Sequence, residues 1–235
     1  MKRFLYINIS LIFCILSIHG NYVWGQEDWN DVRVSSIGKV PPHTNVVPYA
    51  DESGIAELRY YESPFYRSLN GTWKFYMAEN PDSCPKDFFS VGYDVSAWSD
   101  IQVPGNIELQ GRRGAGANMG QEPSGDYFGV PVYVNTRNEF PSNPPYAPTD
   151  FNPTGCYVHD FQVPESWRSR RVFIKFGAVK SAMYLWVNGQ KVGYSEDSKT
   201  PAEWEITKYV HPGQNRLAAQ VIRFSDGSYL ECQDM

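Results

Sequence analysis

The sequence predicts an all-β fold, a β-sandwich preceded by an irregular N-terminal arm. Apolar residues alternate with polar ones in several short runs, which is the period of a half-buried strand. Turn residues separate these runs at intervals of about 8 to 12 residues, as is typical of sandwiches. Beyond the N-terminal apolar run, no segment shows a long helical period. A chain of 235 residues is long enough for one large domain or two small ones.

The composition excludes some classes of partner. The net charge is -5, and there is no run of Lys or Arg. Nucleic acid and anionic membrane surfaces are therefore poor candidates. The aromatic content of 15% supplies side chains that bury well and that also stack on sugar rings.

The first 25 residues are expected to be a secretory signal peptide. Lys2 and Arg3 precede an apolar run over 4–18, and the small residue Gly25 stands at the expected cleavage position. The run is short for a membrane span, and no later segment has the roughly 18 consecutive apolar residues that a span requires. We therefore expect an exported protein, periplasmic or secreted, with no membrane segment after cleavage.

Three cysteines remain once Cys14 is removed with the signal peptide: Cys84, Cys156 and Cys232. A sparse, odd set is not a disulfide framework. One bridge can form, but the sequence does not say between which two. The Cys and His residues lack zinc-ligand spacing, so a structural zinc site is not expected.

Residues 26–65 are expected to form the irregular arm, with a short helix near 51–58. Pro41-Pro42, Pro48 and Pro64 remove backbone donors and interrupt regular structure there. The sandwich, 66–235, follows.

Leu69, Trp73 and Phe75 suit the first half-buried strand of the sandwich, and Asn70-Gly71 is expected to make the turn into it. A helical turn at 85–89 and a short strand at 98–103 come next. Residues 104–152 are mostly loop, and their Gly-rich part, 111–129, resembles a surface insertion.

The chain becomes regular again after residue 152. Alternation predicts strands at 157–163, 172–176, 183–187, 190–194 and 217–224. Asn188-Gly189 between two of these runs is the strongest short hairpin signal. His159 lies on the apolar side of its strand. It is expected to be a core or interface residue, because no nucleophile or carboxylate that could work with it as a base lies nearby.

Seven motifs, in this order, resemble those of family 2 glycoside hydrolases. They are Ser68-Leu69-Asn70-Gly71-x-Trp73-x-Phe75, Val103-Pro104-x-Asn106, Pro131-Val132-Tyr133-Val134-Asn135, Asn143-Pro144-Pro145-Tyr146-x-Pro148-Thr149, Asn152-Pro153-Thr154-Gly155-Cys156-Tyr157, Leu185-Trp186-Val187-Asn188-Gly189-x-x-Val192-Gly193-Tyr194 and Ser225-Asp226-Gly227-Ser228-Tyr229-Leu230-Glu231-x-Gln233-Asp234-Met235. Together they resemble the N-terminal sugar-binding domain of the large β-galactosidases, from about residue 66 to the end.

The resemblance implies a galactose-binding-like jelly-roll sandwich that packs on a catalytic (β/α)8 barrel later in the polypeptide. The family cleaves terminal β-D-galactosides with retention, using two barrel glutamates as acid/base and nucleophile. The chain is therefore expected to be an N-terminal fragment that lacks catalytic residues and the last strand of the sandwich, and that is inactive alone. Its expected partners are a β-galactoside, the missing barrel and further copies in a homo-oligomer.

The resemblance also implies two substrate-binding residues, Asn135 and Asp234, which reach into the galactose pocket. An amide both donates to and accepts from sugar hydroxyls. Asp234 is implied as a ligand of a sodium ion that holds the sugar 6-hydroxyl, and a carboxylate oxygen suits such a hard cation. Magnesium is also implied, with no ligand in this chain. Asp226 and Glu231 are expected to be structural.

Two other functions remain open: a stand-alone, non-catalytic carbohydrate-binding module, and a β-glucuronidase or β-mannosidase of the same family. Reading the sequence beyond Met235 would distinguish them. Two departures from the family pattern lie near the expected site. The stretch 111–129 is longer than the usual link, and Cys232 stands where relatives often carry an acidic residue.

Overall fold

The computed structural model describes residues 27–52, 55, 60–110, 128–129 and 139–231. The predicted signal peptide, Asn135, Cys232, Asp234 and nearly all of the 111–129 stretch lie outside these residues. No helix in the part of the chain that is described is long and apolar enough to cross a membrane.

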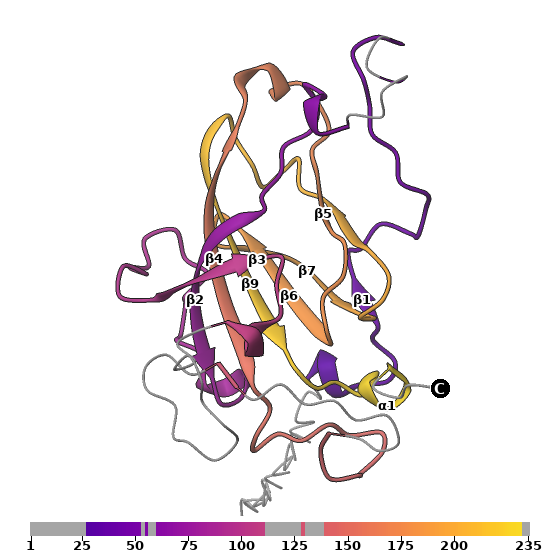
Figure 1. The fold of residues 1–235 in the computed structure, drawn as a ribbon, viewed down its shortest axis with the longest axis vertical. Helices are drawn as coiled ribbons and strands as arrows, with labels where there is room; N and C mark the ends of the chain where they lie inside the picture. Colours follow the sequence, from indigo (N-terminus) through magenta and orange to yellow (C-terminus); the bar gives the residue numbers. More distant parts are fainter. Residues whose placement is uncertain (1–26, 53–54, 56–59, 111–127, 130–138, 232–235) are drawn as a thin grey trace, which may run out of the picture.

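A seven-stranded antiparallel sheet forms the body of the described chain, in the order β1-β7-β6-β9-β4-β2-β3 (Figure 1). Its strands are β1 (Ser36–Ile37), β2 (Gly71–Ala78), β3 (Ser99–Val103), β4 (Thr154–Val163), β6 (Ala182–Val187), β7 (Gln190–Glu196) and β9 (Gly213–Ile222). The two 10-residue strands, β4 and β9, pair along their whole length. A second sheet pairs β5 (Phe173–Phe176) with β8 (Ala202–Glu205).

The main core lies between these two sheets, so the fold is a sandwich of unequal layers. Alternate residues of the large sheet, such as Phe75, Leu185 and Leu217, pack with Ile174 and Trp204 of the small sheet. These five side chains are each at most 6% exposed. Full burial of one such side chain contributes about 1.5–3 kcal/mol. The predicted all-β sandwich is confirmed.

The opposite face of the large sheet is covered by segments without strands. Trp29 of η1 (Asp28–Asn30) and Phe140 pack over Tyr184 and Ile222. Phe88 and its neighbours in 79–98 pack over the part of this face that β4 and β9 form. Because both faces are covered, β6 is buried almost without interruption rather than at alternate residues.

Part of the arm joins the sheet as its edge strand, β1, which pairs with β7. The Trp204 indole N–H donates to the Ile37 carbonyl at 3.0 Å across this edge. A Cβ on Gly193 would lie 2.2 Å from the Ile37 oxygen and 2.4 Å from Trp204 Nε1. Only glycine allows the Ile37 carbonyl and the Trp204 ring to come this close to β7. Beside Gly193, the register of the β6–β7 pair shifts between Leu185 and Trp186, as at a β-bulge.

Most predicted strands are confirmed, with shifted ends. The predicted strand at 217–224 lies mostly within β9, which extends from Gly213 to Ile222. The predicted hairpin joins β6 to β7, and Asn188 and Gly189 have φ of 50° and 79°, as a type I′ turn requires. His159 is half-buried with its ring stacked on Trp73 at 4.8 Å, and burial lowers its pKa. Its expected packing role is confirmed.

One local expectation was wrong, and one strand was not predicted. Residues 85–89 form a turn and not a helical turn, because Asp87 has a φ of 57°, which a right-handed helix does not allow. The sequence pattern did not reveal β8, a 4-residue strand. The predicted helix near 51–58 falls mostly outside the described residues.

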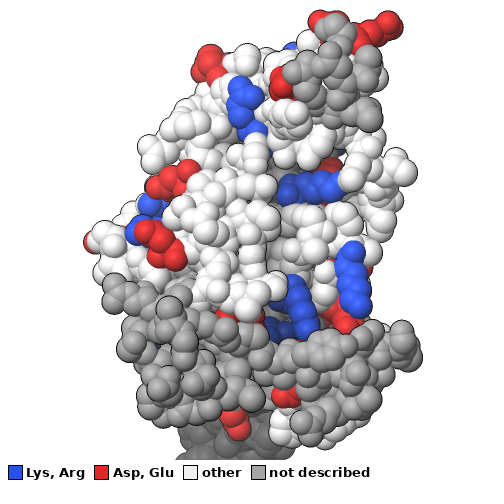
Figure 2. Space-filling model, in the orientation of Figure 1, with Lys and Arg blue, Asp and Glu red and all other residues white. Residues whose placement is uncertain are grey.

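Of the further short helices in the described residues, four lie in connections between strands and α1 follows β9. They are η3 (Tyr60–Glu62), η4 (Pro81–Ser83), η5 (Ile107–Leu109), η6 (Glu165–Trp167) and α1 (Ser228–Glu231). On the face shown in Figure 2, Lys and Arg lie in small separate groups, several of them beside Asp or Glu. Among the described residues on that face, these groups do not join into a continuous basic surface of the kind that binds nucleic acid.

Candidate functional site

The candidate site lies at the end of the sandwich where β9 finishes. After β9 the chain passes through Arg223 and a turn into α1, which ends shortly before Asp234. The coil 139–149 begins shortly after Asn135 and lies at the same end of the molecule as α1 (Figure 1). The described residues therefore include the segment that follows Asn135 and the segment that precedes Asp234, which are called the two flanks below.

Tyr229 joins these two flanks. Its hydroxyl donates to the Tyr146 carbonyl at 3.0 Å and accepts from the Asn143 N–H at 2.8 Å. The Phe140 ring lies edge-on to Tyr229, with centroids 5.3 Å apart, and tilted against Phe224 at 4.7 Å. The coil that follows Asn135 is thereby packed on the turn that leads to Asp234.

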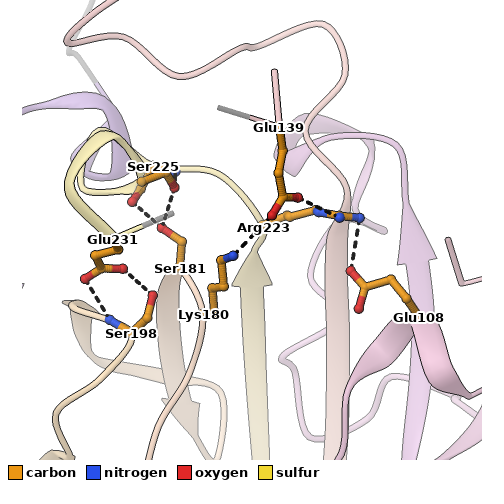
Figure 3. Close-up of polar contacts among 9 residues, drawn as sticks. Glu108, Glu139, Lys180, Ser181, Ser198, Arg223, Ser225 and Glu231 are labelled. Atoms are coloured by element: carbon orange, nitrogen blue, oxygen red, sulfur yellow. Dashed lines mark hydrogen bonds and ion pairs between the residues drawn. The ribbon is translucent and has the colours of Figure 1, made fainter. Parts of the chain in front are cut away.

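Arg223 adds charged contacts between the same segments (Figure 3). Its guanidinium lies 2.8 Å from Glu139 Oε2 and 3.0 Å from Glu108 Oε1. Lys180 Nζ is 3.3 Å from the other oxygen of Glu139. One planar guanidinium thus binds two carboxylates from different segments at once, which suits Arg and not Lys.

Glu139 is buried but stays ionised. Its side chain is 8% exposed. Burial opposes ionisation, but the hydrogen bond from Arg223 and the charge of Lys180 outweigh it and hold the pKa of Glu139 below its usual value. A carboxylate paired in this way fixes geometry and is not available as a general acid at neutral pH.

Three serines, each 0% exposed, tie the turn to the start of β6. The Ser225 N–H donates to Ser228 Oγ at 3.0 Å, and the Ser228 hydroxyl donates to Ser181 Oγ at 3.1 Å. The Ser181 and Ser225 hydroxyls also contact each other (Figure 3). Fully satisfied buried networks of this kind rigidify the backbone that carries them.

Glu231 fixes the last described residues. Its carboxylate accepts from the Ser198 N–H at 2.9 Å and from the Ser198 hydroxyl (Figure 3). α1 has only 4 residues, so these side-chain bonds hold its last residue against Ser198. The structural role expected for Glu231 agrees with these contacts.

Asp226 and Glu196 form an acidic pair beneath the same turn. Glu196 accepts from the Gly227 N–H at 2.6 Å and from the Tyr194 hydroxyl at 2.8 Å. Burial, then the hydrogen bond with Glu196 and the charges of Glu196 and Asp31, raise the pKa of Asp226 to about 7. The pair therefore holds a proton that two separate carboxylates would release well below neutrality.

The structure describes the segments beside the two predicted sugar ligands but not the ligands themselves, so their roles stay predictions. Asn135 and Asp234 lie outside the described residues, but the segments next to them are in contact. The sequence analysis assigned no role to Arg223, Glu139 or the three serines, although Ser225 and Ser228 stand in its last motif. The one available signal was a charged residue, Arg223, at a predicted strand end directly before the Ser225-Asp226-Gly227 motif.

Three described carboxylates at this end are held by neighbouring side chains. Glu139 and Glu231 are engaged by Arg223 and Ser198, and Glu108 pairs with Arg223. Within the described ranges, no group of three or more His, Cys, Asp or Glu side chains could hold a metal ion.

Comparisons with known proteins agree with this picture. The model of the family 2 glycosyl hydrolase sugar binding domain matches residues 66–235. The β-galactosidase of Halalkalibacterium halodurans is 39% identical over 225 residues, which cover 93% of this chain and 20% of that protein. The β-galactosidase of Priestia megaterium is 37% identical over 215 residues, covering 89% of this chain and 19% of that protein.

Among solved structures, a β-glucuronidase from an uncultured Clostridium sp. aligns with a TM-score of 0.44 and 19% identity. The alignment covers 66% of this chain and 21% of that one. The chain spans about a fifth of the length of the curated relatives it matches.

Proposed function

The chain belongs to the family 2 glycoside hydrolases, and from this premise we propose that residues 66–235 are the sugar-binding domain of a retaining β-galactosidase that acts on terminal β-D-galactosides. The single observation that carries the substrate class is 39% identity to a β-galactosidase over nearly the whole chain. Since the chain spans a fifth of that relative, we place the two catalytic carboxylates in a barrel elsewhere in the whole protein. The implied homo-oligomer stays a prediction.

Within this function, the domain supports two ligands of the sugar. We propose that Asn135 and Asp234 project from the joined flanks toward the barrel, where the Asn135 amide binds sugar hydroxyls. Asp234 would bind sodium through a carboxylate oxygen, and the ion would hold the sugar 6-hydroxyl and offset the buried negative charge. The contacts of Tyr229, Arg223 and Glu231 support this by fixing both flanks. We place the implied magnesium outside this chain.

The test uses the full-length enzyme and the substitution Asp234→Ala. We expect sodium dependence to disappear and kcat/KM for a chromogenic β-galactoside to fall by about 30-fold or more, as for a lost charged contact of about 2 kcal/mol. Asp94→Ala, at an exposed carboxylate, is the matched control and should leave both unchanged.

Unchanged kinetics and sodium response in Asp234→Ala would remove Asp234 from the site. A wild-type enzyme that hydrolyses β-glucuronides or β-mannosides in preference to β-galactosides would instead overturn the substrate class.

We also propose that the protein is exported, to the periplasm or beyond, with removal of residues 1–25. The charged start, the apolar run and Gly25 support cleavage at that point. Mass spectrometry of the mature protein should find Gln26 or a near neighbour at the N-terminus. Mature soluble protein that retains Met1 would contradict this.

A further inference from the structure

Two cysteines far apart in the sequence meet inside the described chain. Cys84 and Cys156 are 72 positions apart, and their Sγ atoms lie 2.7 Å from each other. A disulfide bond is about 2.05 Å long, so a small movement of two side chains closes the gap. We propose that Cys84 and Cys156 form a disulfide bond, made by exchange with an external disulfide compound, that fastens the covering segment 79–98 to the large sheet.

The two sulfurs belong to elements of very different kinds. Cys156 is 0% exposed near the start of β4, where it pairs with Gln220 of β9 and Tyr76 of β2. Cys84 directly follows η4 in the segment 79–98, which contains no strand. The bond would therefore anchor an irregular segment to a central strand.

The segment 79–98 depends on side-chain packing because it is not part of a strand ladder. Phe88 and Val95 pack over Cys156, Val158 and Ala218. Irregular segments with few ladder hydrogen bonds open more readily than the sheet beneath them. A covalent link at its start would restrain the segment at a point where it already touches the sheet.

Gln220 and the two different environments determine which sulfur reacts first. Gln220 Nε2 donates to the Pro81 carbonyl at 3.1 Å and to Cys84 Sγ at 3.2 Å. The hydrogen bond from the Cys156 thiol, assisted by the one from Gln220, lowers the pKa of Cys84, while burial raises the pKa of Cys156. Cys84 is also partly exposed. Cys84 is thus the thiolate that meets an external reagent.

The reaction balances as two exchanges with an oxidant such as glutathione disulfide. The Cys84 thiolate attacks one sulfur of the oxidant, whose S–S bond breaks, and the first glutathione thiolate leaves and takes up a proton. Cys156 then loses its proton and attacks Cys84 Sγ, which releases the second glutathione. The protein loses two electrons and two protons, which together are two hydrogen atoms, and the oxidant gains them as two molecules of glutathione. This inference does not rest on the proposed sugar chemistry.

The test uses the full chain, purified reduced and then equilibrated with glutathione disulfide. The protein is denatured in the presence of N-ethylmaleimide, which blocks every free thiol. It is then digested with trypsin without reductant, which places Cys84, Cys156 and Cys232 in peptides 75–86, 138–168 and 224–235, respectively. We expect peptides 75–86 and 138–168 joined, two hydrogens lighter than their sum. Dithiothreitol should separate them.

Cys232→Ser is the matched control and should keep the link, whereas Cys84→Ser should abolish it and leave Cys156 fully alkylated. In reduced native protein, a brief iodoacetamide pulse should label Cys84 at least about ten-fold faster than Cys156, because only the thiolate is nucleophilic and Cys156 is buried. Complete alkylation of Cys84 and Cys156 after equilibration, or a link from either to Cys232, would overturn the proposal. Equal labelling rates would overturn the assigned order of attack.

Discussion

Arg223 shows, at the scale of one residue, how this end of the sandwich is held. Its side chain is 19% exposed and contacts Glu139, which is 8% exposed, and Glu108. Glu139 lies 84 positions earlier in the sequence. No local pattern reveals such a pair, so the sequence pointed to the motif after Arg223 but not to the ion pair that positions it.

Replacement of Arg223 should therefore cost stability. Arg223→Met leaves the buried carboxylate of Glu139 with Lys180 alone, and we expect the free energy of unfolding to fall by about 2–3 kcal/mol, since unpaired buried charges are costly. Urea denaturation measures this. Arg168→Met removes a pair whose side chains are 65% and 69% exposed and should change stability by no measurable amount. Equal effects of the two substitutions would show that the Arg223 pair contributes nothing particular.

Asp226 gives a pH dependence whose sign follows from its raised pKa. The folded state holds the proton up to a pKa of about 7, and the unfolded chain releases it near the usual carboxyl value. The contribution to stability is therefore full below the usual carboxyl pKa and is lost as pH rises toward 7 and above. After discounting for partial exposure we expect a loss of about 1–2 kcal/mol between pH 4 and pH 8.

Asp226→Asn cannot ionise and should flatten this part of the profile, so that the variant is relatively more stable at pH 8 than at pH 5. Thermal melts across this range measure the change. Asp94→Asn alters an exposed carboxyl whose pKa is lowered, and it should leave the slope between pH 5 and pH 8 as it is. A wild-type profile that is flat or rises over that range would contradict the shared proton.

At the scale of elements, the sequence predicted strands wherever alternation and turn chemistry were both local. The Asn188-Gly189 hairpin is the best example, because two residues with positive φ define it. β8 escaped prediction because its 4 residues are strand only through pairing with β5. The packing of strandless segments on the second face of the large sheet was not predicted for the same reason, because it depends on non-local contacts. Asn30 and Ala147, for example, are hydrogen-bonded although they are 117 positions apart.

The junction of β1, β7 and β8 allows a test of this non-local packing. Gly193→Ala places a Cβ 2.2 Å from the Ile37 oxygen and 2.4 Å from Trp204 Nε1. We expect a loss of about 2–3 kcal/mol in the free energy of unfolding, because the backbone must move to relieve the overlap. Gly177→Ala meets nothing within 4 Å and should change stability by less than about 0.5 kcal/mol. A tolerated Gly193→Ala would mean that β1 does not approach β7 as closely as this.

At the scale of the whole molecule, we expect the described chain to support the active site rather than to catalyse the reaction. Among the carboxylates at its candidate site, Glu139 is held by Arg223, Glu231 by Ser198 and Glu196 by Tyr194. Retaining glycosidases need two carboxyl groups about 5–5.5 Å apart that flank a sugar bond. The purified 235-residue chain should therefore not hydrolyse a chromogenic β-galactoside above background, whereas the full-length enzyme should. If the purified chain kept hydrolysing the substrate after further purification, its assignment as a supporting domain would be contradicted.

The place of β9 between β4 and β6 has a consequence for motion. A strand bonded on both sides for most of its length moves only when the sheet moves, so amide hydrogens of β9 should exchange with solvent only through global opening. Arg223 directly follows this strand, so its backbone should move little relative to the sheet. By contrast, α1 is held by contacts to residues next to β6 and β7 rather than by a strand ladder, so its amide hydrogens should exchange faster than those of β9. Hydrogen exchange would therefore separate the rigid strand from the short helix that follows it.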